Sequence, residues 1–216
     1  MNRLDVGSCD LRECNRWLRE AEGPVSVSGC EHLSGVGAAF RSGEFHIEGD
    51  VGDYFGVLND GGSFTVQGSA GRFLGDGMTA GRIRVRGHAG KGAGEYCYGG
   101  SLIIDGNAGD FLATMNKGAR VVAGEAGDDV ATYMVAGEVI VLGNAGERLG
   151  NFLIGGTVYV MGSYGSLGNN AQPAKLRSED VDLLSSLGDH MDRDFNPRSF
   201  QKIVPASSKP FYRGDK

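Results

Sequence analysis

A glycine repeat with a period of 19 residues is the feature that most constrains the fold of this chain. The first glycine of each unit precedes a short apolar segment, and every step to the next unit is 19 residues, except for one step of 18. Each unit follows the template G-x5-G-x2-G-x3-G. Such a regular repeat predicts equivalent structural units that stack on one another. The first glycines are Gly43, Gly62, Gly81, Gly100, Gly118, Gly137 and Gly156.

The other glycines of the template are predicted to form the corners of the stacked units. Glycine at a corner supplies a positive φ or lets two backbones approach closely, and a small residue lies between the second and third glycines of most units. Alanine replaces the fourth glycine at positions 113 and 131. The predicted structural glycines are Gly49, Gly52, Gly56, Gly68, Gly71, Gly75, Gly87, Gly90, Gly94, Gly106, Gly109, Gly124, Gly127, Gly143, Gly146 and Gly150.

The five residues after each first glycine alternate between apolar and other side chains, as in Phe45/Ile47 and Val139/Val141. This period of two predicts a β-strand with one buried face. A repeat of 19 residues is too short for the helix-pair repeats of about 33 residues or more. We therefore predict an all-β fold, a single-stranded parallel β-helix of about seven coils and roughly 34 Å in length, at about 4.8 Å per coil.

The segments outside the repeat are expected to cap the rod, which divides the chain into an N-terminal cap (1–42), the β-helix (43–165) and a C-terminal helical and extended tail (166–216). Gly23 and Gly29 suggest a degenerate extra coil in the first segment. Asp10 and Glu13 have the spacing of a capping box, ahead of a helix whose apolar face carries Leu11, Cys14, Trp17 and Leu18.

A second short helix is predicted in the tail. Ser178 is the expected N-cap and Gly188 the expected stop, with Val181, Leu184 and Leu187 on one face. The last stretch is expected to be extended and to dock through Phe200, Ile203, Val204, Phe211 and Tyr212.

The outward strand positions become apolar in the last four units, which predicts a covered surface, because large apolar patches are rarely left in water. Either the ends of the chain or another subunit would cover it. Arg120 interrupts the alternation, and the 18-residue unit before it suggests a shift of one residue there. The candidate docking face consists of Ile103, Val121, Ile140, Tyr159, Leu142 and Met161.

A column of charged residues follows the third glycines. A solvated edge is the simplest interpretation, with pairs between adjacent coils such as Asp53–Arg72 and Lys91–Asp110. The acidic run within it could instead face a basic partner or a cation. The column consists of Asp53, Arg72, Lys91, Asp110, Asp128 and Glu147.

No motif for catalysis, cofactor binding or metal binding stands out. The four histidines (His32, His46, His88 and His190) form no metal-binding pair, and the four cysteines lack C-x2-C spacing. A net charge of -6 argues against nucleic acid as a partner. The chain has no apolar run of about 20 residues and no signal-peptide core, so we expect a cytoplasmic protein without membrane contact.

The repeated segments GDVGDYFG, GSAGRFLG, GHAGKGAG and GNAGDFLA resemble the GXGXG domain family. The resemblance implies a right-handed β-helix, as in the C-terminal domain of the glutamate synthase large subunit and in the C-type β-helix chain of formylmethanofuran dehydrogenase and related formyltransferase/hydrolase complexes. The leading helix, the coils, the G-S-x-x-S-L-G segment and the helical tail look like the free-standing β-helix chain of split glutamate synthases, such as N-methylglutamate synthase.

That resemblance implies a non-catalytic scaffold subunit in a hetero-oligomer with a glutamine amidotransferase subunit and an FMN-binding synthase subunit. FMN and an iron–sulfur cluster would then lie on the partner and none on this chain. The first alternative is the C-type β-helix chain of a formylmethanofuran dehydrogenase or formyltransferase/hydrolase complex. The second is a stand-alone β-helix enzyme or binding protein, whose candidate aromatic residues Tyr54, Tyr96, Tyr133 and Tyr159 do not form one row.

Overall fold

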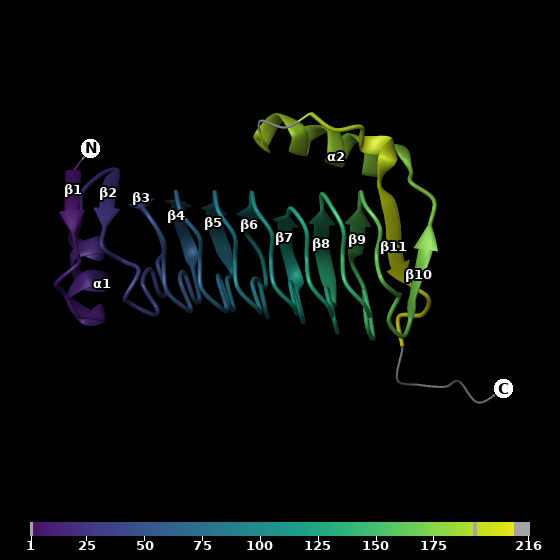
Figure 1. Cartoon of the computed structure of the whole chain (residues 1–216), viewed down its shortest axis with the longest axis horizontal. Coiled ribbons are helices and arrows are strands. Elements are labelled where there is room, and N and C mark those ends of the chain that lie inside the picture. The colour runs from purple at the N-terminus through teal and green to yellow at the C-terminus, as the bar shows by residue number, and fades with distance from the viewer. Residues whose placement is uncertain (1, 192–193, 210–216) are drawn as a thin grey trace.

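The protein is a right-handed parallel β-helix with small helical caps, drawn as a straight rod in Figure 1. This computed structural model describes residues 2–191 and 194–209, and side chains at 2–188, 191 and 194–209. The helices are α1 (Leu11–Glu20), α2 (Ser178–Met191) and the 3-10 helix η1 (Pro197–Ser199). The strands are β1 (Asn2–Asp5), β2 (Val25–Ser28), β3 (Glu44–Glu48), β4 (Asp60–Val66), β5 (Ala80–Val85), β6 (Ser101–Ile104), β7 (Lys117–Ala123), β8 (Ala136–Val141), β9 (Thr157–Val160), β10 (Ala171–Ala174) and β11 (Gln201–Pro205).

Equivalent positions of successive units pair in parallel register, which confirms the predicted coil. Phe45 lies opposite Phe64, Phe64 opposite Ile83, and Ile83 opposite Leu102. The small residues at the corners stack in the same way through isolated parallel bridges, such as Ala89 to Ala108. The core is therefore a set of columns inside the coil, each made of one template position.

The 18-residue unit changes which residues of β7 face outward, and here the prediction for Val121 is wrong. In the structure Arg120 lies opposite Ser101 and Val121 opposite Leu102, so the residues of β7 stay 19 positions from their partners in β6. Val121 therefore points into the coil with Leu102, and Val122 takes the outward position. The one-residue shift suggested by Arg120 is real, and it occurs at the end of the strand: Gly124 N–H bonds to the Gly106 carbonyl 18 positions earlier, whereas Gly106 N–H bonds to the Gly87 carbonyl 19 positions earlier.

The turn opposite the sheet has an unusual backbone in which every second residue has a positive φ. In the second full coil these residues are Phe73 (58°), Gly75 (67°) and Gly77 (67°). Ala113 and Ala131 keep this conformation with φ of 58° and 57° at the positions where alanine replaces glycine. Hydrogen bonds between coils, such as Phe73 N–H to the Lys91 carbonyl at 2.9 Å, hold these residues in a left-handed conformation that non-glycine residues rarely adopt.

The sheet extends beyond residues 43–165 at both ends. At the N-terminal end, β1 and β2 continue the parallel ladder, with Val25 opposite Phe45, so the degenerate unit forms a coil. At the other end, β11 pairs antiparallel with β9, and β10 pairs antiparallel with β11. Each of these additions protects the strand edge that the regular coils would otherwise expose.

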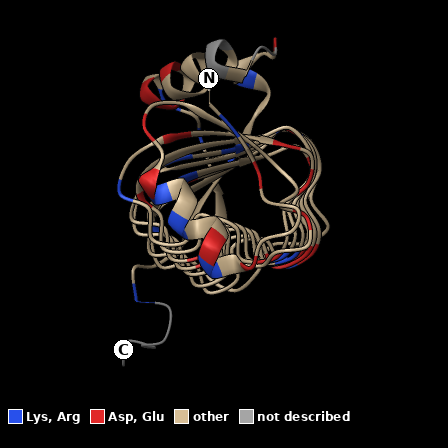
Figure 2. Cartoon of the chain, turned by 90° about the vertical axis from the view of Figure 1, so that its left-hand side faces the viewer, with Lys and Arg blue, Asp and Glu red and all other residues tan. Residues whose placement is uncertain are grey.

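Helix α1 lies across the N-terminal end of the coil stack (Figure 2). Asp10 and Glu13 form the predicted capping box, and Cys14 and Leu18 are buried in the main core. Leu11 is more exposed than the predicted apolar face requires. The amide of Asn15, which that prediction omits, donates to the Gly35 carbonyl and accepts from Gly37 N–H.

Candidate functional site: the outer surfaces of the coil stack

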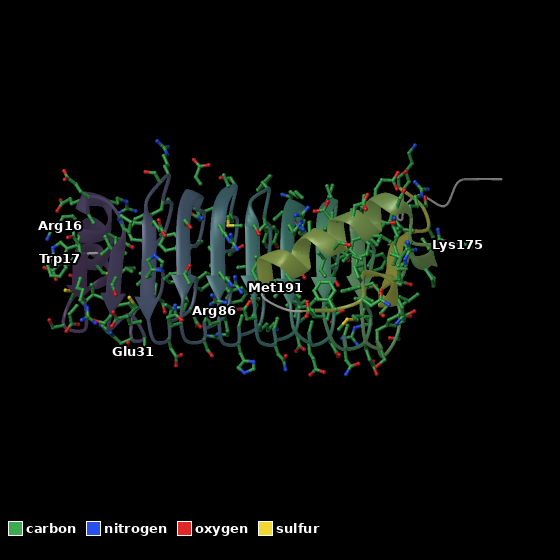
Figure 3. The ribbon with its side chains drawn as sticks, turned by 90° about the horizontal axis from the view of Figure 1, so that it is seen from above. Arg16, Trp17, Glu31, Arg86, Lys175 and Met191 are labelled. Atoms are coloured by element: carbon green, nitrogen blue, oxygen red, sulfur yellow. The ribbon has the colours of Figure 1, made fainter. Side chains whose placement is uncertain are left out.

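Helix α2 covers the apolar outward face of the last four coils. It crosses obliquely over the strands, as Figure 3 shows, and contributes Leu184, Leu187 and Met191. Phe200 and parts of the connecting segment complete the cover. The face beneath these residues consists of Ile103, Val122, Ile140, Leu142, Tyr159 and the partly buried Met161. Five of the six residues of the candidate docking face thus lie under the chain's own tail, and Val121 is replaced by Val122.

The tail helix differs from its prediction at both ends. Ser178 is the first helical residue, and the Asp180 carboxylate accepts from the N–H of Arg177, at 2.7 Å. The helix continues through Gly188 to Met191. Glycine inside a helix costs about 1 kcal/mol, but the longer helix buries Met191 against the sheet. Phe200 and Ile203 are buried as expected, whereas Phe211 and Tyr212 lie outside the described residues.

A buried polar cluster fastens α2 to the sheet. Lys202 Nζ on β11 lies 2.7 Å from both carboxylate oxygens of Asp180, and the Tyr159 hydroxyl donates to Asp180 Oδ1 at 2.5 Å. Burial opposes ionisation of Asp180, but the bonds from Lys202, Tyr159 and the Arg177 N–H outweigh it, so the pKa of Asp180 lies below its usual value. Burial and the neighbouring carboxylate raise the pKa of Tyr159. The glycine repeat in the sequence gives no indication of any of these polar contacts.

The charged column at the corners is a structural ladder. Asp53 Oδ1 accepts from the backbone N–H of Arg72 at 2.7 Å, and its other oxygen pairs with the Arg72 guanidinium at 2.8 Å. Asp110 and Asp128 likewise accept backbone N–H groups of the next coil, both at 2.9 Å. Arg148 then lies between Asp128, Asp129 and Glu147.

The Asp53–Arg72 pair is therefore confirmed, whereas the Lys91–Asp110 pair is wrong. Lys91 Nζ lies instead over the Phe111 ring, 4.4 Å from its centroid. The acidic run is occupied by backbone amides and by Arg148, and no metal-binding group of three or more His, Cys, Asp or Glu residues occurs among the described residues.

Large side chains remain exposed in the turns that lead into β4, β6 and β8, here called the turn edge. Leu58 and Tyr98 are 56% and 57% exposed, and Tyr54, Tyr96 and Val135 also protrude. Tyr54 stacks on Phe73 with ring centroids 4.9 Å apart, and Tyr133 stacks on Phe152. Tyr159, the fourth candidate tyrosine, is buried under α2. We call Tyr54, Leu58, Tyr96, Tyr98 and Val135 the turn-edge ridge.

The described histidines have local structural partners. His46 lies 3.1 Å from Glu44, His32 approaches the Cys9 carbonyl, and His88 Nδ1 accepts from Asn107 N–H at 3.0 Å. The side chain of His190 is outside the described set. The contacts of His32 and His88 are with backbone groups, and His46 pairs with a carboxylate of its own strand.

The cysteines are buried free thiols rather than exposed nucleophiles. Burial raises the pKa of Cys97 to about 12, and its Sγ donates to the Gly75 carbonyl. The hydrogen bond with Cys14, together with burial, raises the pKa of Cys30. These shifts disfavour the thiolates of Cys97 and Cys30, whereas the same hydrogen bond lowers the pKa of the buried Cys14.

Within the part of the chain that is described, no helix is both long and apolar enough to cross a membrane.

Comparison with known proteins agrees with the geometry of the coil. A family model described as the GXGXG motif matches residues 44–191. Among solved structures, the chain is similar to a chain of the formyltransferase/hydrolase complex from Methylorubrum extorquens, whose crystal structure contains methylofuran. The sequence identity is 28%, the TM-score is 0.72, and the match covers 89% of this chain and 85% of that chain. No curated protein sequence matches. Because the matched residues make up more than half of the chain, the protein belongs to the GXGXG motif family.

Proposed function

We propose that this protein is a non-catalytic scaffold subunit of a complex of the formyltransferase/hydrolase type. The observation that carries the proposal is the likeness over 89% of the chain to a chain of such a complex. The site supports the same role, because the described residues hold structural ladders and buried thiols in place of a nucleophile–base pair. A rigid rod of stacked coils is suited to holding catalytic subunits at a fixed separation.

The structural likeness favours this function over the glutamate synthase type that the tail and the G-S-x-x-S-L-G segment suggest. Both are hetero-oligomeric assemblies in which this chain would hold other subunits together. In both, the cofactors would lie on the partner subunits and none on this chain. The two proposals therefore differ in the partners, and a purification that identifies the partners separates them.

We further propose that the catalytic partners contact the turn-edge ridge. The apolar outer face of the sheet is already covered by α2 and Phe200, so it offers little apolar surface to another subunit. Tyr96 and Tyr98 are exposed in the turn that leads into β6. Exposed tyrosines are frequent anchors of protein interfaces because they bury a large ring and keep a polar tip.

The experiment is affinity purification of the tagged chain from its native host, followed by identification of the proteins that co-purify. The proposal expects formyltransferase and hydrolase subunits in stable stoichiometry. A glutamine amidotransferase with an FMN-binding chain would support the glutamate synthase type instead. Recovery of the chain alone, or of flavin or metal bound to the isolated chain, would contradict the scaffold role.

A paired variant tests the proposed contact surface. The double substitution Tyr96→Asp/Tyr98→Asp should reduce co-purification strongly while leaving the fold intact, because both side chains are exposed. Thr65→Asp, on the outward face of β4, is the matched control and should co-purify as wild type does. If both variants recovered the same amount of partner subunits, the turn-edge ridge would not be the contact surface.

A further inference from the structure

A small basic pocket lies where the sheet meets the C-terminal half of α2. Arg82, Ser101 and Arg120 are direct neighbours on β5, β6 and β7, because Arg82 is opposite Ser101 and Ser101 is opposite Arg120. Ser186 and Leu187 of α2, with Ile103 of β6, complete the lining. The pocket encloses about 230 Å³.

The two arginines of this pocket have little negative charge close to them among the described residues. Arg82 has no carboxylate within ion-pair distance among the described residues. Arg120 Nε lies 3.5 Å from Glu138 Oε2, and this buried nitrogen has no hydrogen-bond partner. Because neighbouring strands are about 4.8 Å apart, the backbones of the two arginines lie roughly 10 Å from each other, on either side of Ser101.

In the next outward row, a carboxylate lies beside the arginines of the same sheet. Arg84 and Arg86 both contact Asp105 Oδ2, at 3.1 Å and 2.9 Å. In the pocket row, the position between the two arginines is occupied by Ser101, which carries no charge. Among the described residues, the ion pairs of these two rows involve two carboxylates, Asp105 for Arg84 and Arg86, and Glu138 for Arg120.

We propose that this pocket binds a small oxyanion, a phosphate or carboxylate group. Guanidinium groups on two sides can each donate paired N–H bonds to such a group, which is the geometry that arginine favours. The Ser101 hydroxyl can donate a further bond from between them. Ile103 and Leu187 provide an apolar wall that reduces water access and strengthens these charge-assisted bonds.

The pocket volume limits the ligand to a single anionic group of a few heavy atoms, because sites for larger ligands occupy about 300–1,000 Å³. That group is either a free anion or one end of a longer molecule. An anion held there would touch both the sheet and α2, and would therefore strengthen the contact between them. This binding site is independent of the scaffold role.

The test is isothermal titration of the full chain with inorganic phosphate and, separately, with glutarate, each at constant ionic strength. Saturable binding with a stoichiometry near one is expected for at least one of the two probes. Arg82→Gln and Arg120→Gln should each weaken this binding about tenfold or more, because each removes a charge-assisted hydrogen-bond donor. The probe that binds with the higher affinity shows whether the pocket prefers a phosphate or a carboxylate group.

Arg72→Gln is the matched control, because Arg72 is an exposed arginine paired with Asp53 at a corner outside the pocket. Its binding should equal that of the wild type. Thermal melts without anion check that all three variants are folded. Absence of saturable binding of both probes, or unchanged affinity in folded Arg82→Gln and Arg120→Gln variants, would overturn the proposal.

Discussion

The two halves of the outward sheet face have the same backbone conformation but differ in polarity: the half over β3–β5 is polar, and the half over β6–β9 is apolar. In β3–β5 the central outward residues are His46, Thr65 and Arg84, and Figure 3 shows these strands without a helix above them. In β6–β9 the equivalent residues are Ile103, Val122, Ile140 and Tyr159, which lie beneath α2.

The difference teaches that the coil fixes where side chains point, and that the outward residues decide what the surface binds. An apolar patch of this kind needs a cover, and the tail of the same chain provides it. The polar half needs none, and at the boundary the arginines of β5 and β7 meet the end of α2. The following variants test whether the two halves are as different as this account holds.

Leu184→Asp should have the largest effect, because Leu184 is fully buried between α2 and the sheet. Loss of the packed leucine costs about 2–5 kcal/mol, and a buried carboxylate adds to that cost. We expect a lower melting temperature and increased binding of a hydrophobic dye. Ser185→Asp, on the exposed side of the same helix, is the control and should behave as wild type does. Dye binding that does not change in Leu184→Asp would show that the tail covers nothing.

Asp180→Asn should destabilise the C-terminal half by about 3 kcal/mol at neutral pH, because it leaves the buried Lys202 charge without its counterion. The pKa of Asp180 is lower in the folded protein than its ordinary value of 3.8. Its stabilisation is therefore complete above the unfolded-state pKa and is lost as the pH falls through the folded-state value.

The measurement for this variant is chemical denaturation as a function of pH. The difference between wild type and Asp180→Asn should narrow below pH 3.8. Asp182→Asn changes an exposed carboxylate of the same helix and should give a small difference at every pH. If the difference in unfolding free energy between wild type and Asp180→Asn stayed constant down to acid pH, the ionised carboxylate would not be the source of the stabilisation.

Ala108→Leu tests the coil itself, which both halves share. Ala108 lies in the column of small residues at the corner, between Ala89 and Ala126, and is almost fully buried. A larger side chain there should overpack the corner and cost about 1–3 kcal/mol. Thr65→Leu, on the open polar half, should change the melting temperature little. Equal melting of Ala108→Leu and wild type would contradict the assigned register.

Arg72→Gln should have the smallest effect. The guanidinium is exposed and its pair with Asp53 is screened by solvent, whereas the bond from the Arg72 backbone N–H to Asp53 remains. A melting temperature within experimental error of wild type is expected. A large loss of stability would mean that the charged column holds the coils together through its side chains.

The sequence was sufficient to predict the coil, because the glycine template repeats and like positions must stack. It also predicted that the last four coils need a cover and that the chain's tail could provide it. The position of β7 was harder, since an 18-residue unit does not reveal where the missing residue lies. Val121 and Val122 are both apolar, so neither could be assigned outward from its side chain alone.

Other features depend on contacts between distant segments and leave no local pattern. The positive φ of Phe73 and Phe111 is held by hydrogen bonds from neighbouring coils, and an aromatic residue gives no sign of that conformation. Lys202 meets Asp180 only because β11 returns to pair with β9. The arginine pocket likewise requires the true register of β7, which brings Arg120 beside Ser101.

Hydrogen–deuterium exchange of the chain, alone and in its native complex, tests the central claim most directly. That claim is that the tail covers the apolar face of the last coils and leaves the turn edge for partners. The account predicts that α2 is protected in the isolated chain, and that complex formation adds protection in peptides covering Tyr54–Leu58 and Tyr96–Tyr98. Rapid exchange of α2 in the isolated chain, with new protection of α2 and none at the turn edge in the complex, would contradict it.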